Sequence, residues 1–154
     1  MTALKQKSAR FEVDQSVRVE ELNRDTVIGI GSLDKECACL IPKKVKRHFR
    51  EEFRRQGKTK LFAPTIFAAA IAASLRQCNI KASVIVVDKE YEGYEEHIEM
   101  IVKKAAPHAQ IEFKQIGRKS PAHLIAYKVF KKRQAPDKIL TRTAIIRALP
   151  RGRT

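Results

Sequence analysis

The sequence has few of the residues that mark a disulfide-rich or zinc-binding protein. It contains only three cysteines, Cys37, Cys39 and Cys78, and it has no tryptophan. The cysteines form no CxxC pair, and no spacing of cysteine and histidine in the chain suits zinc. We therefore expect the three cysteines to be buried, reduced thiols.

Long apolar runs and nucleotide-binding motifs are also lacking. The longest apolar run, residues 66–74, is rich in alanine and too short to span a bilayer. The opening MTALKQKSAR lacks the apolar segment of a signal peptide. The chain has no Walker loop, no GxGxxG and no GxSxG. These absences predict a cytoplasmic protein with no membrane partner, and they give little support to a small-molecule enzyme.

Acidic residues are scarce relative to basic ones. The chain of 154 residues has 32 Lys and Arg against 17 Asp and Glu, a formal charge of +15, while 44% of its residues are hydrophobic. This is the composition of one folded domain with a positive surface potential. Such a potential attracts phosphate backbones, so nucleic acid is the expected partner. A contribution of the charge to solubility, or to a salty or hot cytoplasm, is the plainer alternative.

The order of predicted elements indicates an α/β domain. Residues 1–10 are expected to form a basic, flexible arm, residues 11–133 the folded domain and residues 134–154 a basic tail containing a short helix. Hydrophobic patterning and turn residues define the other elements. We expect strands at 11–19, 26–32, 37–41, 82–87 and 111–116, and helices at 42–57, 64–78, 92–106 and 122–132. The short connections make the first three strands an antiparallel meander.

Three segments of the chain resemble the ribonuclease H-like superfamily. The first strand carries VDQS, and LFAPTIFAAAIAASL followed by ASVIVVDKEY is similar to that family's alanine-rich helix and the strand ending in Asp. The last segment, GRKSPAHLIAYKVF, looks like its closing loop and helix. The resemblance covers residues 11–132, and the order of elements agrees with it. It implies a mixed five-stranded sheet, with three antiparallel strands and two that alternate with helices.

The same resemblance implies a metal site. Asp14 and Asp88 would bind Mg²⁺ or Mn²⁺, and His123 stands where the family has Asp, which favours manganese. All three would be catalytic in a two-metal hydrolysis of phosphodiester bonds. The family's Glu is missing, because Ile66 occupies its place; Glu90 or Glu52 could substitute.

Basic residues in two segments are candidates to bind the nucleic acid. The helix at 42–57 is strongly basic and lacks interleaved aromatic residues, so it could follow a phosphate backbone without stacking on bases. The loop before the closing helix adds two further cations. The candidates are Lys43, Lys44, Lys46, Arg47, Arg50, Arg54 and Arg55 in the helix and Arg118 and Lys119 in the loop.

Two other functions compete with this prediction. Asp88, Glu112 and Lys114 match the loose pattern of restriction-endonuclease-like nucleases, in which Asp and Glu bind metal and Lys steadies the attacking water. The missing Glu alternatively indicates a noncatalytic nucleic-acid-binding adaptor on the same fold. The sequence does not distinguish DNA from RNA, and a branched substrate would favour a homodimer by analogy.

Overall fold

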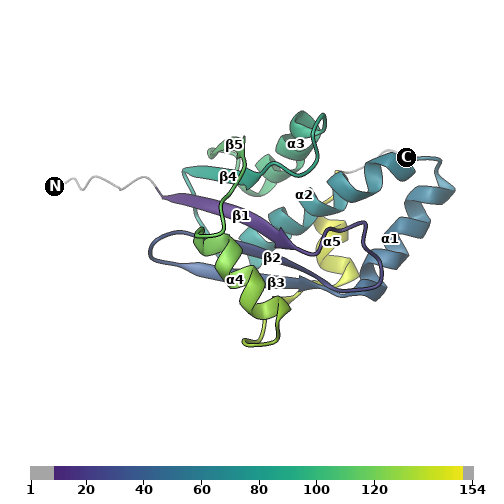
Figure 1. The fold of residues 1–154 in the computed structure, drawn as a ribbon. Helices are drawn as coiled ribbons and strands as arrows, with labels where there is room; N and C mark the ends of the chain where they lie inside the picture. The colour runs from purple at the N-terminus through teal and green to yellow at the C-terminus, as the bar shows by residue number, and fades with distance from the viewer. Residues whose placement is uncertain (1–8, 151–154) are drawn as a thin grey trace.

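The protein is an α/β domain with a mixed six-stranded sheet. The computed structural model describes residues 9–150, and Figure 1 shows their arrangement. The strands are β1 (Arg10–Ser16), β2 (Thr26–Gly31), β3 (Glu36–Ile41), β4 (Val84–Asp88), β5 (Gln110–Lys114) and β6 (Lys138–Ile139). Their order in the sheet is β5-β4-β1-β2-β3-β6. Neighbours β1–β2 and β2–β3 are antiparallel, whereas β1–β4, β4–β5 and β3–β6 are parallel.

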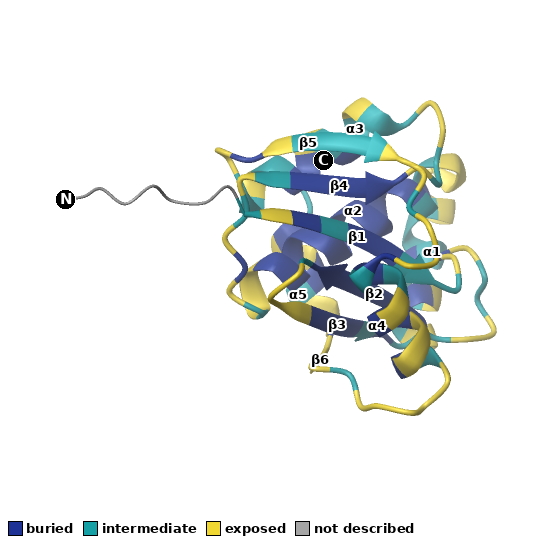
Figure 2. Ribbon diagram, turned by 60° about the vertical axis from the view of Figure 1, so that its left-hand side comes forward, coloured by how far each residue is buried: buried dark blue, intermediate teal, exposed yellow. Residues whose placement is uncertain are grey.

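Helices cover the two faces of this sheet unequally. They are α1 (Lys43–Arg55), α2 (Thr59–Gln77), α3 (Glu95–Ala105), α4 (Pro121–Phe130) and α5 (Arg142–Ala148). α2 packs against α1, α3 and α5, and this group lies on one face, as Figures 1 and 2 show. α4 packs on β1, β2 and β3 from the other face. Most residues of α2 are buried, and Figure 2 shows the dark core between this helix and the strands.

The described structure corrects the expected number of strands and the extent of several elements. The sheet has six strands rather than five, because residues 138 and 139 pair with β3. α5 packs on α2, with Ile145 and Ala148 buried, so this part of the expected tail belongs to the folded domain. β1 ends at Ser16, since Val17 has a φ of 70° and leaves the extended conformation. α2 begins at Thr59 and includes Pro64, at which we expected it to start.

Residues 1–8 of the expected N-terminal arm and residues 151–154 of the tail lie outside the described residues. Arg10, the last residue of that arm, is the first residue of β1.

The cysteines correct a second expectation. Cys37 and Cys78 form a disulfide bond, and Cys39 is the buried free thiol. The pairing is invisible in the sequence because β3 and the end of α2 come together only in the fold. Burial raises the pKa of the Cys39 thiol above its ordinary value, so this thiol stays protonated at neutral pH.

Two glycines in β2 allow α4 to approach the sheet closely. A Cβ atom at Gly29 would lie 2.2 Å from the carbonyl oxygen of Ala122 and 2.9 Å from the Cβ atom of Ala126. A Cβ atom at Gly31 would lie 2.8 Å from the Cβ atom of Pro121. Any side chain at these two positions would push the helix outward. Gly29 also pairs with Asp14 of β1, so the helix lies directly beside that carboxylate.

The Gly29→Ala variant tests this close approach. Its methyl group would meet a backbone oxygen that cannot move without displacing α4, so we expect a loss of about 3 kcal/mol in the free energy of unfolding. Gly117→Ala is the matched control, because no atom lies within 4 Å of the added Cβ. Its stability should change by less than about 1 kcal/mol. Urea denaturation measures both, and equal stability of the two variants would contradict this packing.

Candidate metal and nucleic-acid site

Two buried carboxylates lie side by side on neighbouring strands. β1 and β4 run parallel, and the last registered pair is Val13 with Val87. Asp14 and Asp88 follow this pair, with 5% and 9% of their surfaces exposed. The carboxylates of Asp14, Asp88 and Glu90 each offer a ligand oxygen, and these atoms lie within 4.8 Å of one another. Buried like charges so close together repel each other unless a cation lies between them.

Glu90, two residues beyond Asp88, completes this acidic group. Its pKa is raised by burial and then by the Asp88 carboxyl, whereas the Arg18 guanidinium opposes the rise. Arg18 Nε lies 2.8 Å from a Glu90 oxygen and holds the side chain in place. Of the two expected substitutes for the missing Glu, Glu90 is therefore the one that joins Asp14 and Asp88. Glu52 pairs instead with Arg55 on α1, at 3.1 Å.

His123 contacts Asp14 rather than joining the converging oxygens. Ser120 caps α4 by accepting the Ala122 N–H at 3.1 Å, and Pro121 occupies the first helical turn. His123 follows at once, and its Nδ1 lies 2.9 Å from Asp14 Oδ2. It is not among the residues whose ligand atoms converge. His123 therefore lies against one of the three carboxylates, from outside the group that they form.

The loop before α4 is fixed at both ends. The Ile116 N–H donates to Asp88 Oδ1 at 2.8 Å, and Ser120 at the other end caps the helix. Arg118 and Lys119 lie between these points and are exposed. Both predicted loop cations therefore stand on a short bridge from Asp88 to the helix that carries His123, close to where a phosphate would meet the carboxylates.

A polar network behind the carboxylates was missed in the sequence. The Tyr91 hydroxyl donates to Glu20 at 2.9 Å and accepts from Gln15 Nε2 at 3.1 Å. Arg18 lies over the Tyr91 ring, with 5.6 Å from its Cζ to the ring centroid. Burial raises the pKa of Tyr91, so its hydroxyl stays protonated and can donate. No sequence signal marked Arg18, because the chain has many arginines and the alternating pattern placed Arg18 within the first strand. In the structure the strand ends before it, at Ser16, and the chain turns at Val17.

The basic helix α1 presents fewer free cations than its sequence suggests. Lys43, Lys44 and Arg47 are exposed, and Arg50 is partly buried. Arg54 pairs with Glu51, and Arg55 pairs with both Glu51 and Glu52. Ion pairs of this kind leave less positive charge for phosphate.

Lys46 corrects one of the candidates in α1. It is fully buried, and its Nζ donates to Thr26 Oγ1 at 2.9 Å and to the carbonyl oxygen of Glu21. Burial lowers its pKa to about 8, although Asp25 and Glu21 oppose the shift. Lys46 thus holds the helix to the β1–β2 connection and cannot contact nucleic acid.

Two members of the restriction-endonuclease-like set, Asp88 and Lys114, pair in register on the neighbouring strands β4 and β5. Glu112 lies 3.5 Å from Lys114 and 3.8 Å from Arg10, so its charge is already paired. Its carboxylate is not part of the acidic group that contains Asp88. Ile66 is fully buried in the hydrophobic core, so its position in α2 supplies no ligand.

The donor set of the acidic group fits a hard divalent cation. Three carboxylates offer oxygen ligands, which Mg²⁺ and Mn²⁺ prefer, and all three residues are buried or partly buried. Protein-family models, curated proteins and solved structures give no significant match to the chain. Within residues 9–150, every helix is too short or too polar to cross a membrane.

Mn²⁺ should stabilise the folded protein through these carboxylates. At a concentration a hundredfold above its Kd, a bound ion adds about 2.7 kcal/mol, which raises the melting temperature by several degrees. Asp14→Asn, Asp88→Asn and Glu90→Gln should each remove most of this rise in differential scanning fluorimetry. Glu112→Gln, a partly buried acid of the adjacent strand, should keep it. An equal rise in all five proteins would place the ion elsewhere.

Proposed function

We propose that the protein is a metal-dependent nuclease of ribonuclease H-like architecture that hydrolyses phosphodiester bonds. The observation that carries this proposal is the convergence of Asp14, Asp88 and Glu90 at the ends of adjacent strands in a chain with a formal charge of +15. Clustered, buried acids are typical of functional sites, and the net positive charge of the chain favours a polyanionic substrate.

The topology supports the same architecture. The antiparallel meander β1-β2-β3 continues through β1 into the parallel strands β4 and β5. β1 is thus central, and its Asp14 lies next to the Asp88 end of β4, as the resemblance of the sequence implies. The closing helix α4 brings His123 to the same place. β6 is an addition at the far edge of the sheet, and α5 is an addition that packs on α2.

The residues of the site divide the chemistry among them. Asp14, Asp88 and Glu90 would hold one or two Mg²⁺ or Mn²⁺ ions, which supply charge stabilisation and activation of water when bound. His123 orients Asp14 through the 2.9 Å contact between its Nδ1 and Asp14 Oδ2. Arg18 keeps Glu90 in position through its ion pair.

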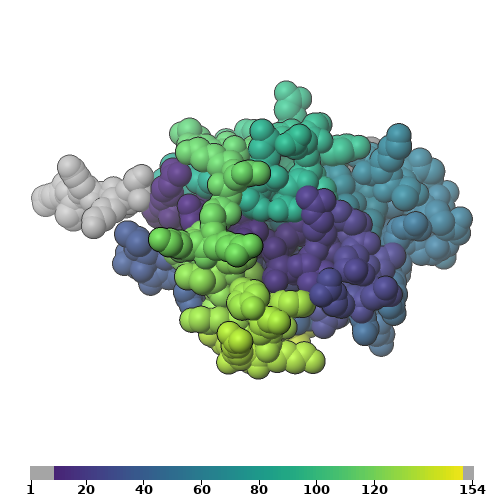
Figure 3. All heavy atoms as spheres, viewed as in Figure 1, coloured from purple at the N-terminus to yellow at the C-terminus, as the bar shows by residue number. Residues whose placement is uncertain are grey.

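The face that carries the site also carries the two loop cations among those expected to hold the substrate. In Figure 3, the green loop and helix of residues 115–130 lie beside the purple N-terminal strand and its following turn. Arg118 and Lys119 belong to this loop, and both are exposed. A phosphate backbone crossing here would meet them next to Asp14 and Asp88. A cytoplasmic location agrees with such a substrate.

A noncatalytic adaptor is the second candidate, and Ile66 favours it. The residue that would complete the carboxylate set in the family is apolar and buried here. On this alternative the protein binds nucleic acid through the same cations, and the carboxylates hold a structural ion.

Cleavage assays decide between the two candidates. We expect wild-type protein with Mn²⁺ or Mg²⁺ to cleave at least one member of a labelled panel of single-stranded, duplex, hybrid and four-way DNA and RNA. Asp14→Asn and Asp88→Asn should lower the rate by at least about a hundredfold while binding persists, since each removes charge stabilisation at the reacting phosphate.

Glu112→Gln and Lys114→Met are the controls in this assay, and both should cleave at the wild-type rate. Loss of cleavage in the Lys114 variant but not in Asp14→Asn would favour the restriction-endonuclease-like set. Binding without cleavage by the wild type across the whole panel would establish the adaptor.

A further inference from the structure

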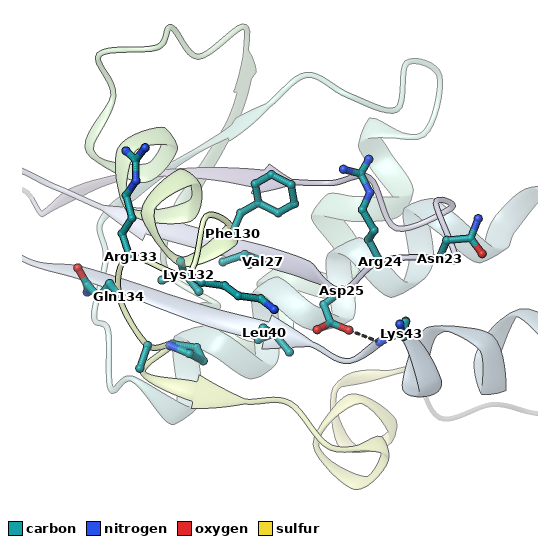
Figure 4. Close-up of a pocket in the computed structure, with 13 residues that line it drawn as sticks. Asn23, Arg24, Asp25, Val27, Leu40, Lys43, Phe130, Lys132, Arg133 and Gln134 are labelled. Carbon is teal, nitrogen blue, oxygen red and sulfur yellow. Dashed lines mark hydrogen bonds between the residues drawn. The ribbon is translucent and has the colours of Figure 1, made fainter.

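A pocket of about 710 Å³ opens at the C-terminal end of α4, away from the carboxylates. It lies between this helix end, the β1–β2 connection and the start of α1 (Figure 4). Its floor is apolar, with Val27 of β2 and Leu40 of β3 lying beneath Val129 and Phe130 of α4. The charged sugar–phosphate backbone of a nucleic acid gains nothing from an apolar surface, whereas the flat face of a nucleobase can pack against one.

The rim of the same pocket is cationic. Its single carboxylate, Asp25, already accepts the backbone N–H of Lys43 at 2.8 Å. The other charged side chains on the rim are all basic, namely Arg24, Lys43, Lys132 and Arg133. An apolar floor within a ring of positive charge complements a ligand that joins an aromatic ring to phosphate.

Phe130 is placed to stack with a planar ring. The Arg24 guanidinium lies 5.5 Å from the Phe130 ring centroid, and Lys131 Nζ lies 5.9 Å from it. Figure 4 shows Arg24 and Arg133 on opposite sides of the Phe130 ring. A base next to Phe130 would gain stacking from the ring and from a guanidinium, and its phosphate would meet the arginines.

Lys132 provides a separate indication of function. Its φ is 60°, and its N–H donates to the Val129 carbonyl at the end of α4. Glycine is the usual residue at such a helix end, because a side chain with this φ is strained. Lys132 thus adopts a strained backbone conformation on the rim of the pocket, and this conformation fixes where its side chain leaves the chain.

The pocket and the carboxylate site share one helix. His123 and Phe130 are seven residues apart on α4, which corresponds to about 10 Å along its axis. A single nucleic-acid strand spans that distance with about three stacked nucleotides. One strand could therefore reach the carboxylates and the pocket together.

We propose that this pocket binds an unpaired nucleotide of the nucleic-acid substrate, a few residues along the strand from the carboxylates. The inference rests on the proposed function and adds a substrate class, since it favours bulged, branched or single-stranded nucleic acid over a regular duplex. The base packs against Phe130, and Arg24, Lys132 and Arg133 hold the adjoining phosphates.

The test compares a short DNA duplex carrying one unpaired 2-aminopurine with the same duplex fully paired, in EDTA so that no cleavage occurs. We expect tighter binding of the bulged duplex, and quenching of the 2-aminopurine fluorescence by stacking. Phe130→Ala should weaken binding of the bulged duplex about tenfold and leave the paired duplex unchanged.

The Lys132→Gly variant shows whether weaker binding could result from misfolding, because it should stabilise the fold and weaken binding at the same time. It should raise the melting temperature by about 2 °C by relieving the left-handed lysine, yet weaken binding of the bulged duplex several-fold. Asn79→Gly is its matched control, because Asn79 also has a positive φ, of 55°, and lies outside the pocket. It should raise the melting temperature and leave binding unchanged.

Two results would overturn the inference. One is equal binding of the bulged and paired duplexes, with Phe130→Ala weakening neither. The other is tighter binding of free adenosine monophosphate than of the bulged duplex, which would assign the pocket to a small nucleotide. The nuclease proposal is tested separately by the cleavage assay. If the wild type shows no metal-dependent cleavage, that proposal fails, whether or not the protein prefers the bulged duplex.

Discussion

The close approach of α4 to β2 is the constraint on which the candidate site depends. Gly29 has no side chain, so the backbone of Ala122 lies where a Cβ atom would be, and the next residue of the helix reaches Asp14. The same helix carries Phe130 at its other end, so its height above the sheet also sets the floor of the basic pocket. The absence of side chains at Gly29 and Gly31 thus sets the position of both regions relative to the strands.

Electrostatics gives the site its second constraint. Three carboxylates share a small volume, and within the described residues Arg18 and His123 are the cationic or ionisable partners that contact them. Arg18 pairs with Glu90, His123 contacts Asp14 and the Ile116 N–H donates to Asp88, yet holding three acids this close together carries an electrostatic cost. The fold tolerates this cost because β1 and β4 are held by parallel pairing and a buried apolar core. A divalent cation would turn the repulsion into binding energy.

The sequence predicted the order of the elements up to α4 through its alternating and continuous apolar runs. The resemblance, rather than the patterning, placed Asp14 and Asp88 together with His123, and it left Glu90 and Glu52 as alternatives for the missing Glu. The sixth strand was missed because a strand of two residues shows no periodicity. The disulfide was missed because its two cysteines are 41 positions apart in the sequence and come together only in the fold. The burial of Lys46 was not predicted because it stands among other basic residues of α1, which made the whole segment read as an exposed basic surface. The pocket depends on Arg24 and Phe130, which come together only when α4 packs on the sheet.

Paramagnetic broadening by Mn²⁺ in the NMR spectrum of the labelled protein tests the central claim most directly, because it locates the ion without requiring any activity. The account predicts that substoichiometric Mn²⁺ first broadens the amide signals of residues 14, 15, 88, 90 and 116, which surround the three carboxylates. Signals of the pocket around Phe130 and of the basic helix α1 should broaden only at higher Mn²⁺ concentrations, because paramagnetic broadening falls steeply with distance from the ion. Broadening centred on any other part of the chain, or spread evenly over its exposed acids, would contradict the assignment of a metal site to Asp14, Asp88 and Glu90.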